Sequence, residues 1–264
     1  MTTPPDNSGD VTVVKLGGST LGAHDTSLHD VAAACRDGRR VVLVHGGGAT
    51  ISAWLARLGI EAKFVRGLRA TDAASLDVVV AVLAGLVNKQ LVAELSAFGA
   101  PAMGLSGADG LVLQAERRDA ELGFVGTITK VNPAPIQELL ARGYVPVIAP
   151  IAVDTSGLAS SQLLNTNADT AAGEIAAALG AQRLIFLTDV DAVLDADKRP
   201  LAHLTSAEAS ALIASGTAAG GMIPKLDAAI RASAAGCATR IVNGTAAGAL
   251  ARVLADDGGG TTVG

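Results

Sequence analysis

The sequence predicts an α/β protein in which helices cover both faces of a central, mostly parallel sheet, a three-layer αβα sandwich. Short β-branched runs alternate along the 264 residues with longer Ala/Leu-rich segments of helical period. This alternation is typical of parallel strands joined by crossover helices. Glycine-rich turns follow the first two runs, where such sheets bind ligands. A chain of this length forms one large domain or two lobes, and a seam between two lobes would fall near Leu179.

Six segments are predicted to be strands of this sheet. They are residues 11–15, 40–44, 102–105, 144–148, 183–188 and 239–242. Residues 111–130 differ, because they alternate around a charged middle and end in β-branched residues. This pattern predicts an antiparallel hairpin, which would either decorate the edge of the sheet or cover a site as a lid.

Three helices have recognisable start signals. Asn132 precedes a proline, which is favoured at the first helical position. Thr205 and Glu208 have the spacing of a capping box, and Asp169 is a candidate N-cap for DTAAGEIAAAL.

The composition narrows the function classes. A net charge of -5 and only six aromatic residues argue against nucleic-acid binding, which uses basic patches and stacking platforms. No uninterrupted apolar run approaches the roughly 20 residues of a membrane span, and the polar start MTTPPDNSGD does not resemble a signal peptide. We therefore expect a cytoplasmic protein with a small-molecule ligand. Cys35 and Cys237 have no metal-ligand or disulfide spacing and are expected to be buried thiols.

Two glycine turns are the strongest local signals. VVLVHGGGAT, residues 41–50, leads from a strand through Gly47 and Gly48 into a helix, and VVKLGGST places Lys15 at the end of the first strand. Bare amides at a helix N-terminus bind anions, although a tight turn alone would use the same glycines. Because Lys15 lies beside such turns, a role in binding a phosphoryl group is favoured over that of a solvated charge at the edge of the sheet. The P-loop, dinucleotide and protein-kinase motifs are absent from the sequence.

The motifs together resemble the amino acid kinase family, and within it the acetylglutamate kinases. The resemblance runs nearly end to end and rests on VVKLGG, VHGGG, KFVRGLRATD, VNK, GLSGADG, LGFVGTITKVNP, YVPVIAPIAVD, NTNADTAAGEIAAAL, LTDVDAVLD, GTAAGGMIPK and GTTV. It implies the amino acid kinase fold. It also implies an N-terminal lobe, residues 1–179, for acetylglutamate binding and dimerisation, and a C-terminal lobe, residues 180–264, for ATP.

The implied reaction is ATP-dependent phosphorylation of the γ-carboxylate of N-acetyl-L-glutamate. Mg²⁺ would be held through the nucleotide phosphates and water, with no metal-ligand motif in the chain. The rival activities are a kinase for a carrier-protein-linked aminoadipate or glutamate, and a non-catalytic sensing module on the same fold. The first would need a basic groove, and the second would not need both lysines.

The resemblance also assigns the catalytic and substrate-binding residues. Lys15 and Lys225 would flank the γ-phosphoryl group, and Asp169 would orient both lysines. This suits a loose transition state, which asks mainly for positioning and charge stabilisation. The substrate-binding residues would be Gly47, Gly48, Arg69, Asn165 and Asn167, with the planar Arg69 guanidinium gripping the α-carboxylate. His45 is expected to be structural, since the carboxylate nucleophile needs no base.

The nucleotide-binding residues follow in the same way. Gly18 would lie on the opposite side of the moving phosphoryl group, and Asp189 beside the adenine and ribose. Val193 and Leu194 would sandwich the base, or would equally be core residues. Gly220 and Gly221 would contact the phosphates.

Assembly is inferred from the ends and from one apolar segment. In arginine-inhibited members of the family, an extra N-terminal helix links dimers into a hexamer. Here only ten residues precede the first strand, and their prolines disfavour such a helix. We therefore expect a homodimer that moderate arginine does not inhibit. The apolar residues 76–87 would form either its interface or part of the core.

Overall fold

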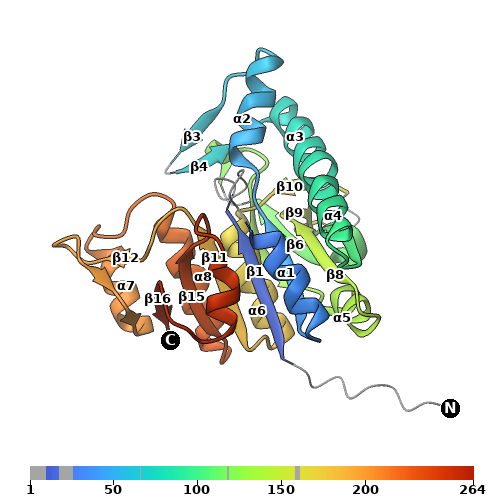
Figure 1. The fold of residues 1–264 in the computed structure, drawn as a ribbon. Coiled ribbons are helices and arrows are strands. Elements are labelled where there is room, and N and C mark those ends of the chain that lie inside the picture. Colours follow the sequence, from blue (N-terminus) through green and yellow to red (C-terminus); the bar gives the residue numbers. More distant parts are fainter. Residues whose placement is uncertain (1–9, 18–25, 66, 118, 158–160) are drawn as a thin grey trace.

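An eight-stranded sheet forms the middle layer of the protein (Figure 1). The computed structural model describes residues 10–17, 26–65, 67–117, 119–157 and 161–264. In spatial order the strands are β14 (His203–Leu204), β16 (Thr261–Val263), β15 (Ala238–Asn243), β11 (Arg183–Thr188), β1 (Val11–Leu16), β2 (Arg40–His45), β8 (Val145–Ala149) and β5 (Ala102–Ser106). All neighbouring pairs are parallel except β15 and β16, so the predicted mostly parallel sheet is confirmed.

All six predicted strands are present. The segment 183–188 has the predicted ends, and in each of the other five strands one or both ends shift by one residue. Two expectations fall outside the described residues: the nucleotide-binding assignment of Gly18, and the absence of a linking helix in residues 1–9.

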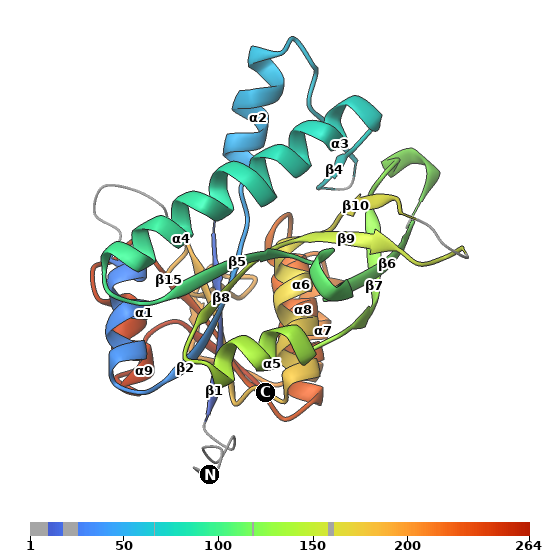
Figure 2. The same ribbon diagram turned by 90° about the vertical axis from the view of Figure 1, so that its right-hand side faces the viewer.

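Helices cover both faces of the sheet, which gives the three-layer αβα sandwich (Figure 2). One face carries α1 (Ser27–Arg36), α3 (Ala73–Val80), α4 (Asn88–Ala97) and α9 (Ala249–Leu254). The other carries α5 (Ala134–Ala141), α6 (Ala168–Leu179), α7 (Ser206–Ala214) and α8 (Met222–Ala234). The helix α2 (Gly48–Arg57) packs on the first face through Ile51 and Leu55.

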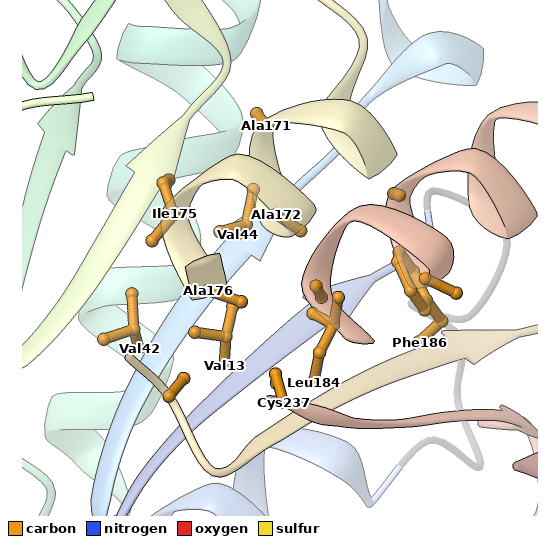
Figure 3. Packing of buried hydrophobic residues seen from close by; sticks show 14 of the residues in the cluster. Val13, Val42, Val44, Ala171, Ala172, Ile175, Ala176, Leu184, Phe186 and Cys237 are labelled. Atoms are coloured by element: carbon orange, nitrogen blue, oxygen red, sulfur yellow. The ribbon is translucent and has the colours of Figure 1, made fainter. Parts of the chain in front are cut away.

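Successive residues of the central strands contribute to two separate hydrophobic clusters, because side chains alternate between the faces of a strand. Val13 and Leu184 meet α6 on one face, whereas Val14 and Ile185 meet the opposite helix layer. In Figure 3 the alanines of α6 lie over the strands beside Ile175. These small side chains let α6 lie close to the sheet.

The predicted hairpin is confirmed, but it does not extend the edge of the main sheet. Its strands β6 (Leu113–Arg117) and β7 (Gly126–Val131) are antiparallel and belong to a separate four-stranded sheet with β9 (Ile151–Asp154) and β10 (Leu163–Asn165). Buried Leu113 and Leu164 on this sheet join the main core, which explains the separate layer. The remaining elements are short: β3 (Lys63–Val65), β4 (Leu68–Ala70), β12 (Val193–Leu194), β13 (Pro200–Leu201) and 3₁₀ turns at Asp109–Leu111 and Ala120–Leu122.

Of the three helix starts, one is as predicted. Thr205 and Glu208 form a complete capping box. Helix α5 begins one residue later than expected, with Pro133 at the N-cap position. The N-cap of α6 is Asn167 and not Asp169, because the Asn167 Oδ1 accepts from the backbone N–H of Asp169 at 2.8 Å and of Thr170 at 3.0 Å. The Asp169 carboxylate is therefore available for other contacts.

A continuous helix of 25 residues, Ala73–Ala97, comprises α3, a π-helical segment (Ala81–Val87) and α4. Its length, and the mean hydropathy of 1.7 over an 18-residue window within it, would suit a membrane span, but core helices of soluble proteins meet the same criteria. Here Val79, Leu83 and Leu91 are buried in the core on one side. The segment 76–87 thus contributes to the core, one of its two predicted roles.

Neither cysteine has the properties of a reactive thiol. Cys237 is buried as expected, whereas Cys35 is half-buried. Burial raises the pKa of the Cys35 thiol to about 11 and that of Cys237 to about 12. Both thiols are therefore protonated at neutral pH, which agrees with a packing role.

The contact between α6 and α8 yields the first prediction. A Cβ added at Gly173 would lie 2.8 Å from the backbone oxygen of Ala228, which has little room to move. We expect Gly173→Ala to lower the free energy of unfolding, because overpacking costs about 1–3 kcal/mol and outweighs the gain of about 1 kcal/mol in helix propensity. Urea unfolding would measure the change.

Gly85→Ala is the matched control, since its Cβ would meet nothing within 4 Å. Equal stability changes in the two variants would contradict close packing at Gly173.

Candidate active site

The carboxyl ends of β1 and β2 lie side by side, with Leu16 paired to His45. From His45 the chain passes through the glycine turn into α2, whose first backbone hydrogen bond runs from Ile51 N to Gly47 O at 2.9 Å. The first N–H groups of a helix have no acceptor within that helix and favour anions. The glycine turn therefore presents an anion-binding helix end at the edge of the sheet.

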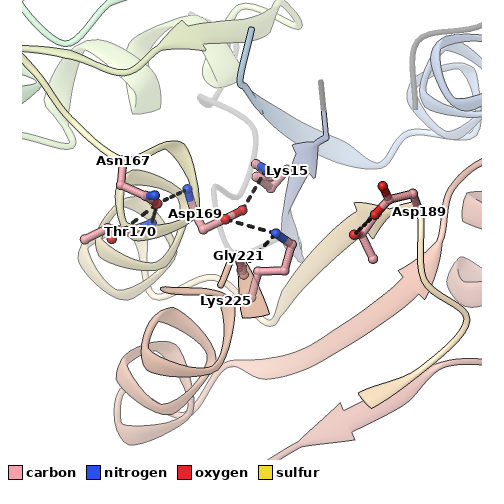
Figure 4. A network of polar contacts seen from close by, with 8 residues as sticks. Lys15, Asn167, Asp169, Thr170, Asp189, Gly221 and Lys225 are labelled. Atoms are coloured by element: carbon pink, nitrogen blue, oxygen red, sulfur yellow. Dashed lines mark hydrogen bonds and ion pairs between the residues drawn. The ribbon is translucent and has the colours of Figure 1, made fainter. Parts of the chain in front are cut away.

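Three charged side chains from three elements meet next to this turn (Figure 4). Lys15 comes from β1, Asp169 from the first turn of α6 and Lys225 from the first turn of α8. The Asp169 carboxylate lies 2.7 Å from Lys15 Nζ through Oδ1 and 3.1 Å from Lys225 Nζ through Oδ2. The lysines share one carboxylate, and the N-terminal ends of α6 and α8 add partial positive charge.

Burial shapes the charge of this triad, the group of Lys15, Asp169 and Lys225. The side chains of Lys15 and Asp169 are each 8% exposed, and that of Lys225 is 13% exposed. Desolvation lowers the pKa of Lys15, with a smaller contribution from Lys225, while Asp169 opposes the shift. The Asp189 carboxylate adds a weaker attraction to Lys15, so within the triad itself two ammonium groups share one carboxylate, an arrangement that suits a phosphate.

A cleft of about 250 Å³ opens beside the triad. It contains seven of the residues that sequence analysis assigned to the substrate and catalytic roles: Lys15, Gly47, Gly48, Arg69, Asn165, Asn167 and Asp169. Residues from β1, the glycine turn, β4, β10 and α6 thus converge on one site.

Arg69 forms one wall of the cleft. Its Nη2 donates to Gly48 O at 3.0 Å and to Ser52 Oγ at 2.8 Å, and the guanidinium lies over the Phe64 ring. Its Nη1 is buried and has no hydrogen-bond partner among the described residues. A buried donor without a partner is costly, so an acceptor such as a carboxylate fits here.

The two asparagines differ in their available groups. Asn165 donates from Nδ2 to Thr71 Oγ1 at 3.1 Å, which directs its amide by a contact that sequence analysis did not anticipate. The Asn167 oxygen is used by the helix cap, so its amide N–H groups are what it offers to the cleft. The predicted substrate contact of Asn167 is thus limited to donation.

The residues assigned to the nucleotide lie apart from the cleft lining. Gly220 and Gly221 immediately precede α8, and Gly221 O accepts from Lys225 Nζ at 3.2 Å. Asp189 follows β11 and accepts from Thr188 Oγ1 at 3.2 Å (Figure 4). The side chain of Val193 is in the core, whereas Leu194 is 45% exposed. Of this pair, Leu194 has the side-chain surface that a base could cover.

His45 and Asn88 are fully buried directly behind the glycine turn. Burial lowers the pKa of His45 to about 4, so the imidazole is neutral at pH 7. This fits the expected structural role of His45. Asn88 received no role from the sequence, although VNK was one of the motifs that carried the resemblance.

The fold and the paired lysines define an α/β protein built to bind and transfer a phosphoryl group. The chain belongs to the amino acid kinase family, whose sequence profile matches residues 10–243. A protein named acetylglutamate kinase from Dehalococcoides mccartyi is 45% identical to this chain, and the match covers 97% of this chain and 95% of the relative. A second protein of that name, from Solibacter usitatus, is 48% identical, and the match covers 94% of this chain and 97% of the relative. The resemblance read from the sequence is confirmed.

Solved structures agree with this assignment of the fold. The smu.665 protein of Streptococcus mutans superimposes with a TM-score of 0.81 at 28% identity, covering 96% of this chain and 98% of its own. N-acetylglutamate synthase from Neisseria gonorrhoeae superimposes with a TM-score of 0.82 at 26% identity, covering 97% of this chain and 59% of its own. A Giardia carbamate kinase superimposes with a TM-score of 0.66 at 20% identity, covering 97% of this chain and 99% of its own. This likeness shows the fold alone.

The triad predicts the effect of removing its carboxylate. Asp169→Asn should lower kcat for phosphoryl transfer by at least about 100-fold, because preorganised charge supplies most of such catalysis. Asp169 raises the pKa of Lys15, so the variant should hold Lys15 less protonated and lose further activity as pH rises. Steady-state kinetics between pH 7 and 9 would measure both effects.

Glu138→Gln is the control, since it removes a carboxylate that is 74% exposed on α5 and should leave kcat unchanged. Circular dichroism should show both variants folded, because Asn167 still caps α6 in Asp169→Asn. Near-normal turnover in Asp169→Asn would contradict the role of the triad.

The lowered pKa of His45 predicts that this residue contributes to stability at neutral pH and that the contribution is lost in acid. Its pKa is about 4 when folded against 6.5 when unfolded, so the unfolded chain binds the extra proton first. This contribution is present above about pH 6.5 and is lost as pH falls towards 4. Denaturant unfolding across this range should show a shallower pH slope for His45→Asn than for the wild type, and equal slopes would contradict the shifted pKa.

Proposed function

We propose that this protein transfers the γ-phosphoryl group of ATP to the γ-carboxylate of N-acetyl-L-glutamate, as an acetylglutamate kinase. The observation that carries the proposal is that the lysine–aspartate–lysine triad adjoins a cleft with a buried arginine nitrogen that has no hydrogen-bond partner among the described residues. Relatives of that name match nearly the whole chain. The alternative of a non-catalytic sensing module leaves the paired buried lysines without a purpose.

At the substrate end, Arg69 Nη1 would donate to the α-carboxylate of acetylglutamate. The Asn165 amide oxygen would accept the N–H of the acetylated amine, since the Asn165 nitrogen already donates to Thr71. The γ-carboxylate would then extend along the cleft towards Lys15 and the Gly47 and Gly48 amides. Its pKa near 4.3 leaves it ionised at neutral pH, so it attacks without a general base.

At the phosphoryl end, Lys15 and Lys225 would bind the transferred group from two elements, while Asp169 holds them in place. The carboxylate oxygen forms a bond to the γ-phosphorus as the bond from phosphorus to the β-phosphate oxygen breaks, which gives an acyl phosphate and ADP. Charge that develops on the phosphoryl oxygens would be stabilised by the two ammonium groups and by the glycine amides.

The nucleotide would lie towards residues 180–264, with Gly220, Gly221 and the N-terminus of α8 near its phosphates. Asp189 and the exposed Leu194 would flank the ribose and base. Among the described residues no group of three His, Cys, Asp or Glu side chains could hold a metal. We propose that Mg²⁺ enters with ATP through phosphate oxygens and water, supplying charge neutralisation at the phosphates.

We further propose a cytoplasmic homodimer in which the lobe formed by residues 1–179 supplies the interface. The outward side of the helix Ala73–Ala97 carries exposed Ala81 and Gly85 beside half-buried Val80 and Ala84. Small apolar side chains of this kind allow a second helix to approach closely. Neither nucleic acid nor a membrane is expected as a partner.

Hydroxamate trapping of the acyl phosphate would test the activity. Purified protein with ATP and Mg²⁺ should form the hydroxamate from N-acetyl-L-glutamate and far less from glutamate, aspartate or free aminoadipate. Equal use of aminoadipate would favour the carrier-linked kinase. ATP-dependent product from none of the four would reject the kinase proposal.

Arg69 predicts a selective effect on substrate recognition. Arg69→Ala should raise KM for acetylglutamate roughly 10- to 100-fold, because a charge-assisted hydrogen bond contributes about 1.5–3 kcal/mol. KM for ATP should change little. Initial-rate kinetics with each substrate varied in turn would separate the two.

Arg57→Ala is the matched control, since Arg57 contacts the Trp54 ring and does not line the cleft. A rise confined to the KM for ATP in Arg69→Ala would move Arg69 to the nucleotide end and reject this mapping.

A further inference from the structure

A buried polar pair lies behind the glycine turn and outside the residues that line the cleft. His45 ends β2, and Asn88 begins α4 directly after the π-helical segment. Both side chains are 0% exposed, and the Asn88 Nδ2 lies 3.2 Å from the His45 Nε2. Burying two polar side chains together is costly unless each of their polar groups has a hydrogen-bond partner.

The orientation of the Asn88 amide is fixed by its neighbours. The Nδ2 has two hydrogens for three acceptors: one donates to Val147 O at 2.9 Å, and the other is shared between Leu105 O at 3.3 Å and the His45 Nε2 at 3.2 Å. The Oδ1 accepts from Lys89 Nζ at 3.0 Å. Rotating the amide by half a turn would place its NH₂ against the Lys89 ammonium and its oxygen against two carbonyl oxygens. The amide nitrogen must therefore face His45.

This orientation fixes the tautomer of His45. Because Asn88 presents N–H to the Nε2, that nitrogen has to be the acceptor, and the single proton of the neutral ring resides on Nδ1. The Nδ1 lies 2.9 Å from Gly46 O and donates to it. The lowered pKa of His45 keeps the ring in this neutral form.

The hydrogen bond to Gly46 O sets the direction of the next amide. In a trans peptide the C=O and the following N–H point in opposite directions. When His45 holds the Gly46 oxygen, the N–H of Gly47 must point away from His45. Since Gly46 and Gly47 both line the cleft, this arrangement fixes the amide that the phosphoryl group would meet.

Two close approaches keep the same elements in register. A Cβ on Gly47 would lie 2.7 Å from Leu83 Cδ2, so the glycine turn rests directly on the π-helical segment. A Cβ on Gly104 of β5 would overlap the Asn88 side chain and lie 2.6 Å from Lys89 Nζ. The VNK and GLSGADG motifs therefore meet in one structural unit behind the turn.

We propose that Asn88 is a positioning residue for phosphoryl transfer, which acts by holding His45 in the Nδ1–H tautomer so that the Gly47 amide faces the cleft. The inference rests on the proposed function. It assigns the long helix a role in the site, although Asn88 itself touches neither substrate.

Kinetics of Asn88→Ala would test the proposal. We expect kcat per folded molecule to fall about 10- to 100-fold with both KM values within about twofold, because misplacing a group by about 1 Å costs up to about 100-fold. Gln90→Ala, an exposed change two residues along α4, is the control and should match the wild type. A purely structural role would lower the melting temperature of Asn88→Ala and leave kcat of the folded fraction intact, and that result would overturn the proposal.

A pair of His45 variants remains informative where Asn88→Ala does not fold. Asparagine at position 45 places its amide nitrogen near the Nδ1 position and keeps a donor for Gly46 O, whereas glutamine places its amide nearer the Nε2 position. His45→Asn should therefore retain at least about tenfold more kcat than His45→Gln. Equal activities, or the reverse order, would overturn the proposal.

A third measurement does not depend on activity. In ¹⁵N spectra of the wild-type protein at pH 7, His45 should show a protonated Nδ1 and an unprotonated Nε2, with His45→Asn identifying the signals. The opposite tautomer would overturn the positioning role even in an active enzyme. Absence of acyl phosphate from a wild-type protein with the expected tautomer would instead reject the proposed function.

Discussion

Two buried ammonium groups that share one carboxylate are the interaction on which the rest of the site depends. Charges taken out of water are destabilising unless they are paired with good geometry. Asp169 lies within 3.1 Å of both lysine nitrogens, and the Asp189 carboxylate adds only a weaker attraction to Lys15. An anionic ligand would interact favourably with both ammonium groups, and the phosphoryl group of a nucleotide carries that charge.

The packing of the helices sets the distances in this triad. Asp169 and Lys225 come from helices whose axes approach closely at Gly173, where α6 leaves no room for a side chain against Ala228. Lys15 comes from β1, onto which α6 packs through its alanines. Three elements far apart in the sequence are thus brought to one point by small residues in the core. The positions of the three charged groups are therefore set by apolar packing several residues away.

Much of this arrangement could be predicted from sequence, because strand periodicity and glycine turns are local signals. The order of apolar runs predicted the six strands, and the rule that parallel sheets bind ligands at carboxyl ends placed Lys15 beside Gly47. The cap of α6 was misassigned because Asn167 and Asp169 are both good capping residues, and only the backbone geometry selects between them. The second sheet was also missed, since alternation predicts a hairpin but not the sheet with which it pairs. The Arg69 bonds to Gly48 and Ser52 depend on tertiary contacts that a single sequence does not encode in any local pattern.

Several buried polar side chains cluster next to the candidate active site. Lys15, Asp169, His45 and Asn88 are all buried, and all belong to or adjoin the carboxyl ends of β1 and β2. Apolar residues of similar volume would pack there at less cost in desolvation. A chain selected for stability alone would not place a histidine and an asparagine behind a glycine turn already held by strand pairing. Their hydrogen bonds specify a direction, that of one backbone amide, and direction is what hydrophobic packing does not supply. The glycine turn is free of side chains and cannot orient itself, so the polar pair behind it provides the orientation that phosphoryl transfer needs.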